Sequence, residues 1–234
     1  MITIKKKYLC IIPARGGSKG IPNKNLTKLG DNSILGNTIL QAQKANFFDY
    51  IHVSTDSLDI KMEALEYGAS CEFLRPKEFS NDTIGTREAI KSSISSLRKL
   101  GKYFDYVFEL QPTYVFRKTE TLNEIKKIIE KYDAVVTVKI VRDTGHPDYI
   151  CTSKGGLLIH GKELPDKFNR HKLREKYAVI GLALASKVEV VMNYDSIFKS
   201  KCSFYEVDNP IEMLDINEKD DLFICRQVYK ELNN

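Results

Sequence analysis

The stretch "IIPARGGSKGIPNKNL", residues Ile11–Leu26, decides how the rest of this chain is interpreted. An apolar run, Tyr8–Ala14, has the composition of a buried strand, and a glycine-rich basic loop follows it at once. Glycines let a loop turn sharply and bring N–H groups close to a ligand, while Arg and Lys bind phosphate oxygens. The glycines and cations are Gly16, Gly17, Gly20, Arg15, Lys19, Lys24 and, slightly further on, Lys28. The stretch therefore predicts a strand that ends in an anion-binding loop.

The spacing of these glycines argues against the two commonest phosphate loops. The pattern G-x-x-x-x-G-K-[ST] is absent, and glycines at 16, 17 and 20 do not form G-x-G-x-x-G. Kinase-type and dinucleotide-binding interpretations therefore lose support. Residue types alone leave one alternative open, a surface turn whose cations are only solvated.

Strand-like and helix-like segments alternate along the chain. Apolar runs typical of strands are Tyr8–Ala14, Tyr50–Asp56, Tyr106–Pro112, Ala134–Ile140, Ala178–Ser186 and Cys202–Asp208. Helical spacing of apolar residues covers 33–45, 57–68, 86–101, 121–132 and 217–232. The alternation predicts an α/β fold with a mostly parallel sheet and helices on both faces. We expect one domain, residues 1–234, with an excursion at roughly 141–177 where short antiparallel strands lie over a site or at a subunit contact.

The pattern also predicts details within three helices. Leu58, Met62 and Leu65 are expected to face the core from the second helix. Thr121 and Glu124 have the spacing of a capping box at the start of the fourth. The expected inward residues of the last helix are Leu222, Cys225, Val228, Tyr229 and Leu232.

Bulk composition narrows the class of protein. The 234 residues are 42% hydrophobic and 29% charged, as is typical of a soluble globular domain. Pro13 and Arg15 cut the first apolar run short, no cleavage site follows, and no stretch approaches the roughly 20 apolar residues of a membrane span. We therefore expect a cytoplasmic protein with no membrane partner.

Charge and cysteine usage exclude further classes. The net charge of +5 is mild and forms no basic stripe, so we expect no nucleic-acid partner. The 5 cysteines form no C-x-x-C pair, which predicts reduced thiols without a disulfide framework or a zinc site. The 4 histidines are scattered and show no metal-ligand spacing.

Five segments in chain order resemble the acylneuraminate cytidylyltransferases, the CMP-sialic acid synthetases. They are "IIPARGGSKGIPNKNL", "VSTDS" (Val53–Ser57), "FLRPKEFSNDT" (Phe73–Thr83), "LQPTYVFR" (Leu110–Arg117) and "MLDINEKDDL" (Met213–Leu222). The first and third are highly specific, whereas residues 141–185 match poorly. The resemblance implies a three-layer, Rossmann-like nucleotidyltransferase fold with a small dimerisation excursion, and a homodimer. It also implies that CMP passes from CTP to the anomeric hydroxyl of an acidic nonulosonic sugar, with release of pyrophosphate.

The same resemblance assigns roles position by position. The implied CTP-binding residues are Ala14, Arg15, Gly16, Gly17, Ser18, Lys19, Asn25, Arg75 and Thr86. The implied catalytic residues are Arg15, Lys19, Lys24 and Asp215. Their cations would surround the bridging oxygens, where charge develops. Gln111 and Arg170 would bind the sugar, and Asp215 and Asn217 would hold Mg²⁺, which prefers oxygen ligands.

The chain departs from the family pattern on the metal side and in one loop. Asn217 stands where the family has the second Asp of I-D-I-D, which predicts weaker metal binding, although a helix N-cap would explain Asn217 equally. Asp215 by itself would also suit a helix N-terminus. "TYVFR" replaces T-S-P-L-R, so Tyr114, Val115 and Phe116 are expected to reshape the sugar pocket.

The residues expected to bind the acceptor sugar differ further from the family pattern. With Gly181 taken as the family's glycine, Ala178, Ile180 and Leu184 stand where sialic acid-specific members carry Arg, Asn and Tyr. Core packing explains Ile180 and Leu184 as well as a change of acceptor does. The departures suggest an acceptor such as a diamino nonulosonic acid. Two alternatives stay open, transfer to a different acidic acceptor such as Kdo, and a nucleotide-binding relative that has lost catalysis.

Overall fold

The computed structural model describes residues 5–80, 85–141, 151–154, 157–160 and 175–233, with the backbone alone at 77, 151–154 and 157–160. The main sheet contains β1 (Tyr8–Pro13), β4 (Tyr50–Ser54), β5 (Tyr106–Glu109), β6 (Ala134–Ile140), β9 (Tyr177–Lys187) and β10 (Cys202–Glu206). The α-helices are α1 (Ile34–Ala45), α2 (Leu58–Glu66), α3 (Thr86–Lys99), α4 (Thr119–Ile129), α5 (Val188–Asn193) and α6 (Lys219–Asn233). The predicted strands and helices are confirmed in order and type, with ends that move by a few residues.

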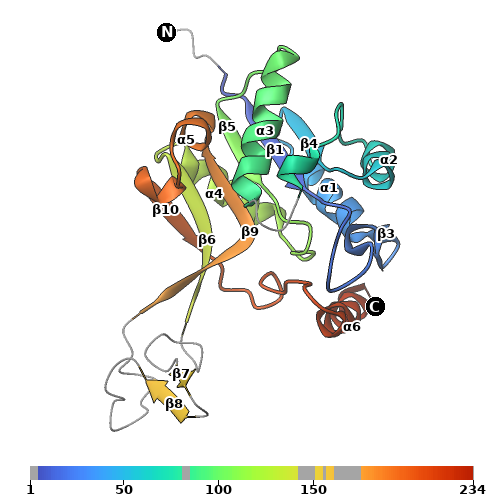
Figure 1. Cartoon of the computed structure of the whole chain (residues 1–234), viewed down its shortest axis with the longest axis vertical. Helices are drawn as coiled ribbons and strands as arrows, with labels where there is room; N and C mark the ends of the chain where they lie inside the picture. Colours follow the sequence, from blue (N-terminus) through green and yellow to red (C-terminus); the bar gives the residue numbers. More distant parts are fainter. Residues whose placement is uncertain (1–4, 81–84, 142–150, 155–156, 161–174, 234) are drawn as a thin grey trace.

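The sheet has the strand order β10-β6-β9-β5-β1-β4 (Figure 1). β1 pairs in parallel with β4 and β5, and β10 pairs in parallel with β6. β9 lies between β5 and β6 and runs antiparallel to both. The predicted α/β fold with a mostly parallel sheet is confirmed.

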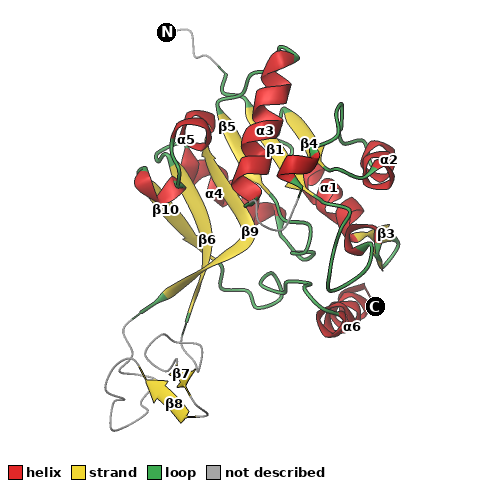
Figure 2. Ribbon diagram, viewed as in Figure 1, coloured by secondary structure: helices red, strands yellow, loops and turns green. Residues whose placement is uncertain are grey.

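Alternation along β1 explains why helices cover both faces of the sheet. Tyr8, Cys10 and Ile12 face a core shared with α1, α2 and α4. Leu9 and Ile11, between them, face a second core shared with α3 and α5. Successive side chains of a strand point to opposite faces, so a continuous apolar strand needs a helical layer on each side. Figure 2 shows these helices on the two sides of the sheet, a three-layer arrangement.

A bulge interrupts β9 opposite β6. Val136 pairs with Leu184, but the next residue, Thr137, pairs with Ile180, so residues 181–183 have no partner in the ladder. The buried Thr137 hydroxyl lies 2.8 Å from the carbonyl of Ile180 and 2.9 Å from that of Ala183, and it accepts from the Ala183 N–H at 3.2 Å. Bulges redirect side chains near functional sites. Here the bulge points Gly181 toward the carboxyl end of β5.

Two smaller β-elements complete the fold. β2 (Lys28–Leu29) and β3 (Asn32–Ser33) form a short hairpin before α1. β7 (Cys151–Lys154) and β8 (Leu157–His160) pair antiparallel within the predicted excursion, beyond the ends of β6 and β9 and away from the main sheet (Figure 1). Whether this excursion makes a subunit contact stays a prediction, and Arg170 lies outside the described residues. Within the described ranges, no helix is both long and apolar enough to cross a membrane.

The predicted core face of α2 is wrong. Leu58, Met62 and Leu65 are 66%, 57% and 47% exposed, whereas Ile60 and Ala64 are buried. Both sets have helical spacing, so the sequence could not distinguish them. Ile60 and Ala64 pack into the core shared with β1 and α1, so packing rather than spacing sets the rotation of α2.

Two details of the other helices are also corrected. Thr121 is not the N-cap of α4, because the helix begins at Thr119 and the Thr121 hydroxyl donates to Glu212 at 2.9 Å. Glu212 also accepts from the Lys118 N–H at 2.9 Å, so a carboxylate from a distant segment satisfies this helix end. In α6, Leu222 and Cys225 are buried as predicted, but Leu232 is 58% exposed.

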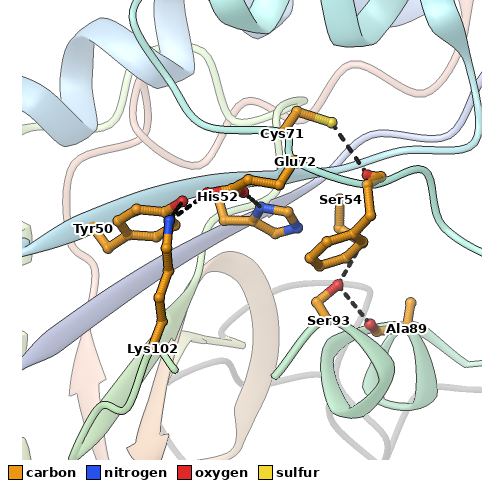
Figure 3. Close-up of polar contacts among 9 residues, drawn as sticks. Tyr50, His52, Ser54, Cys71, Glu72, Ala89, Ser93 and Lys102 are labelled. Carbon is orange, nitrogen blue, oxygen red and sulfur yellow. Dashed lines mark hydrogen bonds and ion pairs between the residues drawn. The ribbon is translucent and has the colours of Figure 1, made fainter. Parts of the chain in front are cut away.

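A buried histidine couples the stability of β4 to pH. Burial, followed by the charges of Lys102 and Arg75, lowers the pKa of His52 to about 4. Glu72 Oε2 lies 3.6 Å from His52 Nδ1, but Lys102 binds the same carboxylate and offsets its attraction for a proton (Figure 3). His52 is therefore neutral in the folded chain at pH values where it would be protonated in the unfolded chain.

This depressed pKa predicts loss of stability in mild acid. Between about pH 6.5 and pH 4 the unfolded chain binds the His52 proton and the folded chain does not, so the free energy of unfolding falls as pH falls, by up to about 3 kcal/mol from this group. Urea unfolding of the wild type and His52→Gln between pH 4 and 7 checks this. The variant should show a flatter dependence on pH, and an unchanged slope would contradict the assignment.

Candidate active site

The glycine loop leaves β1 at the carboxyl edge of the sheet and is held there by two side chains. The Gly16 N–H donates to Asp56 Oδ1 at 2.9 Å, and Asp56 follows the end of β4. Asn25, which is 7% exposed, donates from Nδ2 to the carbonyl of Arg15 at 3.0 Å. Ligands of open α/β sheets bind beyond the carboxyl ends of the strands. The loop is therefore held open over the expected binding edge.

The glycines of this loop let other groups come close to its backbone, and none of them adopts a left-handed conformation. Left-handed glycines in the described ranges are Gly30, Gly68 and Gly101. A Cβ at Gly20 would lie 2.5 Å from the carbonyl oxygen of Asn217, so a side chain there would displace the C-terminal loop. Gly17 has no atom within 4 Å of its would-be Cβ. The space at Gly17 is open toward any ligand of the loop.

A cavity of about 360 Å³ opens beside this loop. Its lining residues are Pro13, Arg15, Ser18, Lys24, Asn25, Arg75, Phe79, Ser80, Gly85, Thr86, Ala89, Gln111, Pro112 and Thr113. Of the predicted site residues, the structure brings together around this cavity Arg15, Ser18, Lys24, Asn25, Arg75, Thr86 and Gln111. Those outside the lining are Ala14, which is buried, Gly16, Gly17, Lys19, Asp215 and Asn217.

The cavity, as far as the chain is described, is lined by cations and by no carboxylate. Arg15, Lys24 and Arg75 line it, and the N-terminus of the 14-residue helix α3 reaches it at Thr86. A helix N-terminus adds partial positive charge and unpaired N–H groups. Lys28 does not line the cavity, and its Nζ donates to the Asp31 carbonyl at 3.1 Å. The arrangement suits a polyanion.

Arg75 is anchored to β4 rather than free to move. Its Nε donates to Ser54 Oγ at 3.1 Å and its Nη2 donates to the Ser54 carbonyl. Ser54 Oγ in turn lies 2.8 Å from Ser93 Oγ on α3 (Figure 3). Ser54 therefore links β4, α3 and Arg75. Burial lowers the pKa of Arg75 and nearby Arg15 lowers it further, whereas Asp56 raises it.

The loop that carries Asp215 is tied to the edge of the cavity. Lys24 Nζ donates to the carbonyls of Ile216 and Asn217 at 2.9 and 3.2 Å, and the Ile216 N–H donates to Thr113 at 3.2 Å. Asp215 is thus held next to two lining residues, Lys24 and Thr113. Two of the three Lys24 N–H groups are used by this contact, so Lys24 positions the loop as well as adding charge.

Asp215 carries a carboxylate oxygen that could act as a ligand to a metal cation. Its Oδ1 is buried and has no hydrogen-bond partner in the described part of the chain, and its Oδ2 accepts from Asn217 Nδ2 at 3.0 Å. The Asn217 amide therefore orients the carboxylate of Asp215, while the backbone N–H groups of Asn217 and Glu218, just before α6, donate to Asp221. No group of three His, Cys, Asp or Glu able to hold a metal occurs in the described ranges. One orphaned carboxylate oxygen beside a phosphate-type pocket fits Mg²⁺, which takes few protein ligands.

Gln111, which is predicted to bind the sugar, lies against the bulge of β9. A Cβ at Gly181 would lie 2.3 Å from Gln111 Oε1, so only glycine lets Gln111 pass this strand. The Gly181 N–H donates to the Tyr114 hydroxyl at 3.2 Å. Burial and the charge of Asp215 raise the pKa of Tyr114. Tyr114 thus lies between the bulge and the acidic loop.

The other residues that differ from the family pattern lie either in the hydrophobic core or at a cavity. Val115 and Ile180 are buried core residues, which confirms the packing alternative for Ile180. Leu184 is partly buried and lines a second cavity next to β5. Phe116 packs against the cluster that holds α6.

Sequence reasoning missed the residue that connects these parts. Arg117 is 3% exposed and donates at 2.8 Å to Gln41 Oε1 and to the carbonyls of Gln111 and Leu182. The sequence did offer a signal for this role, because Arg117 ends the segment "LQPTYVFR" and lies close to an apolar strand. An arginine buried in such a place needs hydrogen-bond partners. Phe79 and Ser80 were also missed as lining residues, although they lie in the quoted segment Phe73–Thr83.

Comparison with known proteins identifies the family. The chain matches the model of the cytidylyltransferase family over residues 9–177, more than half of its length. It is 37% identical over 135 residues to a CMP-N,N'-diacetyllegionaminic acid synthase of Legionella pneumophila, which covers 56% of this chain and 57% of that protein. It is 30% identical over 242 residues to an N-acylneuraminate cytidylyltransferase of Escherichia coli, which covers 98% of this chain and 54% of that protein. The chain therefore belongs to the cytidylyltransferase family and spans about half the length of these relatives.

Solved structures confirm the fold. A CMP:2-keto-3-deoxy-manno-octonic acid synthetase complexed with CTP superposes with a TM-score of 0.73 at 14% identity, over 97% of this chain and 100% of that one. A 4-diphosphocytidyl-2C-methyl-D-erythritol synthase of Anaerococcus prevotii gives 0.65 at 14% identity, over 96% and 99%. At such identities the likeness establishes the nucleotidyltransferase fold alone.

The role of Arg117 predicts a large stability effect. Arg117→Met should lower the free energy of unfolding by about 3 kcal/mol or more, because the Gln111 and Leu182 carbonyls lose a buried donor. Guanidinium unfolding measures the change. Arg226→Met is the matched control, since Arg226 is exposed and makes one 3.3 Å bond to the Lys28 carbonyl. Equal midpoints for the two variants would contradict the prediction.

Proposed function

We propose that this protein transfers CMP from CTP to the anomeric hydroxyl of an acidic nonulosonic sugar and releases pyrophosphate. The observation that carries the proposal is the cation-lined cavity at the carboxyl edge of β1, β4 and β5, with Asp215 at its rim. Relatives named legionaminic, pseudaminic and N-acylneuraminate cytidylyltransferases support both the nucleotide and the class of acceptor.

The nucleotide would be held by groups already in place. Arg15, Ser18 and the N-terminus of α3 would bind the phosphates, with the open space at Gly17 beside them. Charge builds on the bridging oxygen as pyrophosphate leaves, and fixed cations stabilise it without reorganisation. The exposed side chain of Lys19 would move over the same phosphates and add positive charge there. Arg75 and Asn25, both buried and hydrogen-bonded, would contact the nucleoside end.

Asp215 would hold Mg²⁺ through its orphaned Oδ1, with Asn217 keeping the carboxylate in place through Oδ2. The ion would neutralise phosphate charge and lower the pKa of the attacking hydroxyl. The neutral amide of Asn217 leaves this site with one fewer negative charge than two aspartates would give. We therefore expect weak binding of free Mg²⁺ and tighter binding when CTP is present.

The acceptor would lie at Gln111, where the bulge of β9 meets the cavity. Arg170 remains the proposed partner of the sugar carboxylate, and the homodimer remains part of the proposal. Loss of catalysis is the alternative that Asn217 favours, because a site with one carboxylate is the first place where turnover would fail.

The proposed reaction predicts pyrophosphate release from CTP alone among the four nucleoside triphosphates. Release should require Mg²⁺ and one acid from a panel of sialic, legionaminic and pseudaminic acids, and it should stop when a chelator is added. Release with Kdo instead would favour the other acceptor class. Binding of CTP without release for any acid would favour the non-catalytic alternative.

Two substitutions test the assigned residues. Lys19→Ala and Asp215→Ala should each lower kcat/KM about 100-fold or more, because each removes charge that stabilises the transition state. Lys28→Ala and Asp220→Ala are matched controls, since both side chains are exposed, Lys28 Nζ donates to the Asp31 carbonyl and Asp220 lies in the first turn of α6. Thermal unfolding should be similar for all four variants. Wild-type rates in either of the first two would show that the residue's assigned role is wrong.

A further inference from the structure

Tyr114 is buried beside the candidate active site but does not line its cavity. The side chain is 6% exposed and packs in the same core cluster as Ile180 and Leu182 of β9. Pro112 and Thr113, the two residues before it, line the cavity, whereas Tyr114 does not. Any effect of Tyr114 on a ligand therefore passes through the groups that its hydroxyl contacts.

On the β9 side, this hydroxyl binds the bulge. Residues 181–183 have no partner in the ladder, and the Gly181 N–H donates instead to the Tyr114 hydroxyl at 3.2 Å. A backbone N–H that leaves the ladder needs another acceptor, so this bond fixes the bulge at Gly181. Gln111 lies against the same glycine, since a Cβ there would be 2.3 Å from Gln111 Oε1. Tyr114 therefore holds the strand segment that the proposed sugar-binding residue touches.

On its other side, Tyr114 faces the loop that carries Asp215. The Ile216 N–H donates to the Thr113 carbonyl at 3.2 Å, so the residues next to this pair, Tyr114 and Asp215, are neighbours. Burial raises the pKa of Tyr114, and the charge of Asp215 raises it further. The carboxylate therefore lies within electrostatic reach of the phenol.

The hydrogen-bonding capacities of these two groups match. A phenol has one proton to donate as well as lone pairs that accept, and the Gly181 N–H occupies one of the lone pairs. Asp215 Oδ1 is buried and has no partner in the described ranges, while Oδ2 accepts from Asn217 Nδ2. An ionised carboxylate has about four acceptor sites, so it can accept from a phenol and an amide and still bind a cation.

We propose that Tyr114 is a positioning residue whose hydroxyl ties Asp215 to the bulge of β9 at Gly181. The phenol would donate to the Asp215 carboxylate while it accepts from the Gly181 N–H. Tyr114 and Asn217 are both residues at which the chain departs from the family pattern, and they would hold one carboxylate between two neutral donors. The inference rests on the proposed function and adds the residue that sets the distance between the metal side and the acceptor side.

The kinetic test uses Tyr114→Phe, which keeps the ring and removes the hydroxyl. We expect kcat to fall about tenfold or more, because a displacement of about 1 Å between reacting groups is costly. The KM for CTP should stay within twofold, because every residue that lines the cavity is kept.

Tyr8→Phe is the matched control for this variant. Tyr8 is 5% exposed, and its hydroxyl donates to Glu130 Oε1 at 2.7 Å at the start of β1, the end of the strand opposite the glycine loop. Both variants lose the hydroxyl of a buried tyrosine, so thermal unfolding should show similar losses of stability. Only Tyr114→Phe should lower kcat.

A measurement without substrates or metal reads the proposed link itself. In protein labelled with ¹⁵N at glycine, the Gly181 N–H resonance reports on its bond to Tyr114. Asp215→Asn removes the charge that faces the phenol, and it should shift this resonance in the wild-type background and leave it nearly unchanged in Tyr114→Phe. Gly101, exposed just after α3, should not shift in either background.

The two measurements separate failure of this inference from failure of the proposed reaction. A Gly181 response that disappears in Tyr114→Phe, together with the lower kcat, supports the link. Equal Gly181 shifts in the two backgrounds, or a wild-type kcat in folded Tyr114→Phe, would overturn it. If the wild type releases no pyrophosphate with any acid, the proposed function fails, and the Gly181 response by itself decides whether Tyr114 joins the two segments.

Discussion

The candidate site depends on one buried guanidinium. Arg117 bonds the loop that carries Gln111, the bulge of β9 at Leu182 and Gln41 on α1. A buried charge is tolerated only when its donors are paired in good geometry, so these three segments are required to stay together. Burial lowers the pKa of Arg117 to about 10, which still leaves it charged at neutral pH. The position of the acceptor side relative to the sheet follows from this contact.

The antiparallel strand β9 gives the site its second constraint. A parallel strand in the same place would end at the carboxyl edge, whereas β9 enters from that edge and brings its bulge there. Thr137 fills the bulge with its hydroxyl, which leaves Gly181 facing Gln111. Gln111 lines the cation-lined cavity, whereas Leu184 and Ser186, beyond the bulge, line the second, largely apolar cavity.

Much of the fold and part of the site could be predicted from local patterns. The apolar run Tyr8–Pro13 identified a buried central strand, because strands covered on both faces are continuously apolar. The glycine loop with Arg15 and Lys24 predicted an anion site, because those residue types act within one short segment. The rotation of α2 could not be predicted, because Leu58–Met62–Leu65 and Ile60–Ala64 have equally good helical spacing.

By itself, the sequence determined the order of strands and helices, the glycine-rich basic loop and the family resemblance, since each depends on residues close together in the chain. Only the tertiary structure decided that Asp215 has an orphaned oxygen, that Asn217 supports it, and that Glu109 shares a cavity with unpaired Ser186. The bond from Asn217 to Asp215 is local, but the burial of Asp215 and the shared cavity arise from contacts between segments separated by tens of residues or more. Burial and pairing across such distances depend on packing, and packing has no local signal in a single sequence.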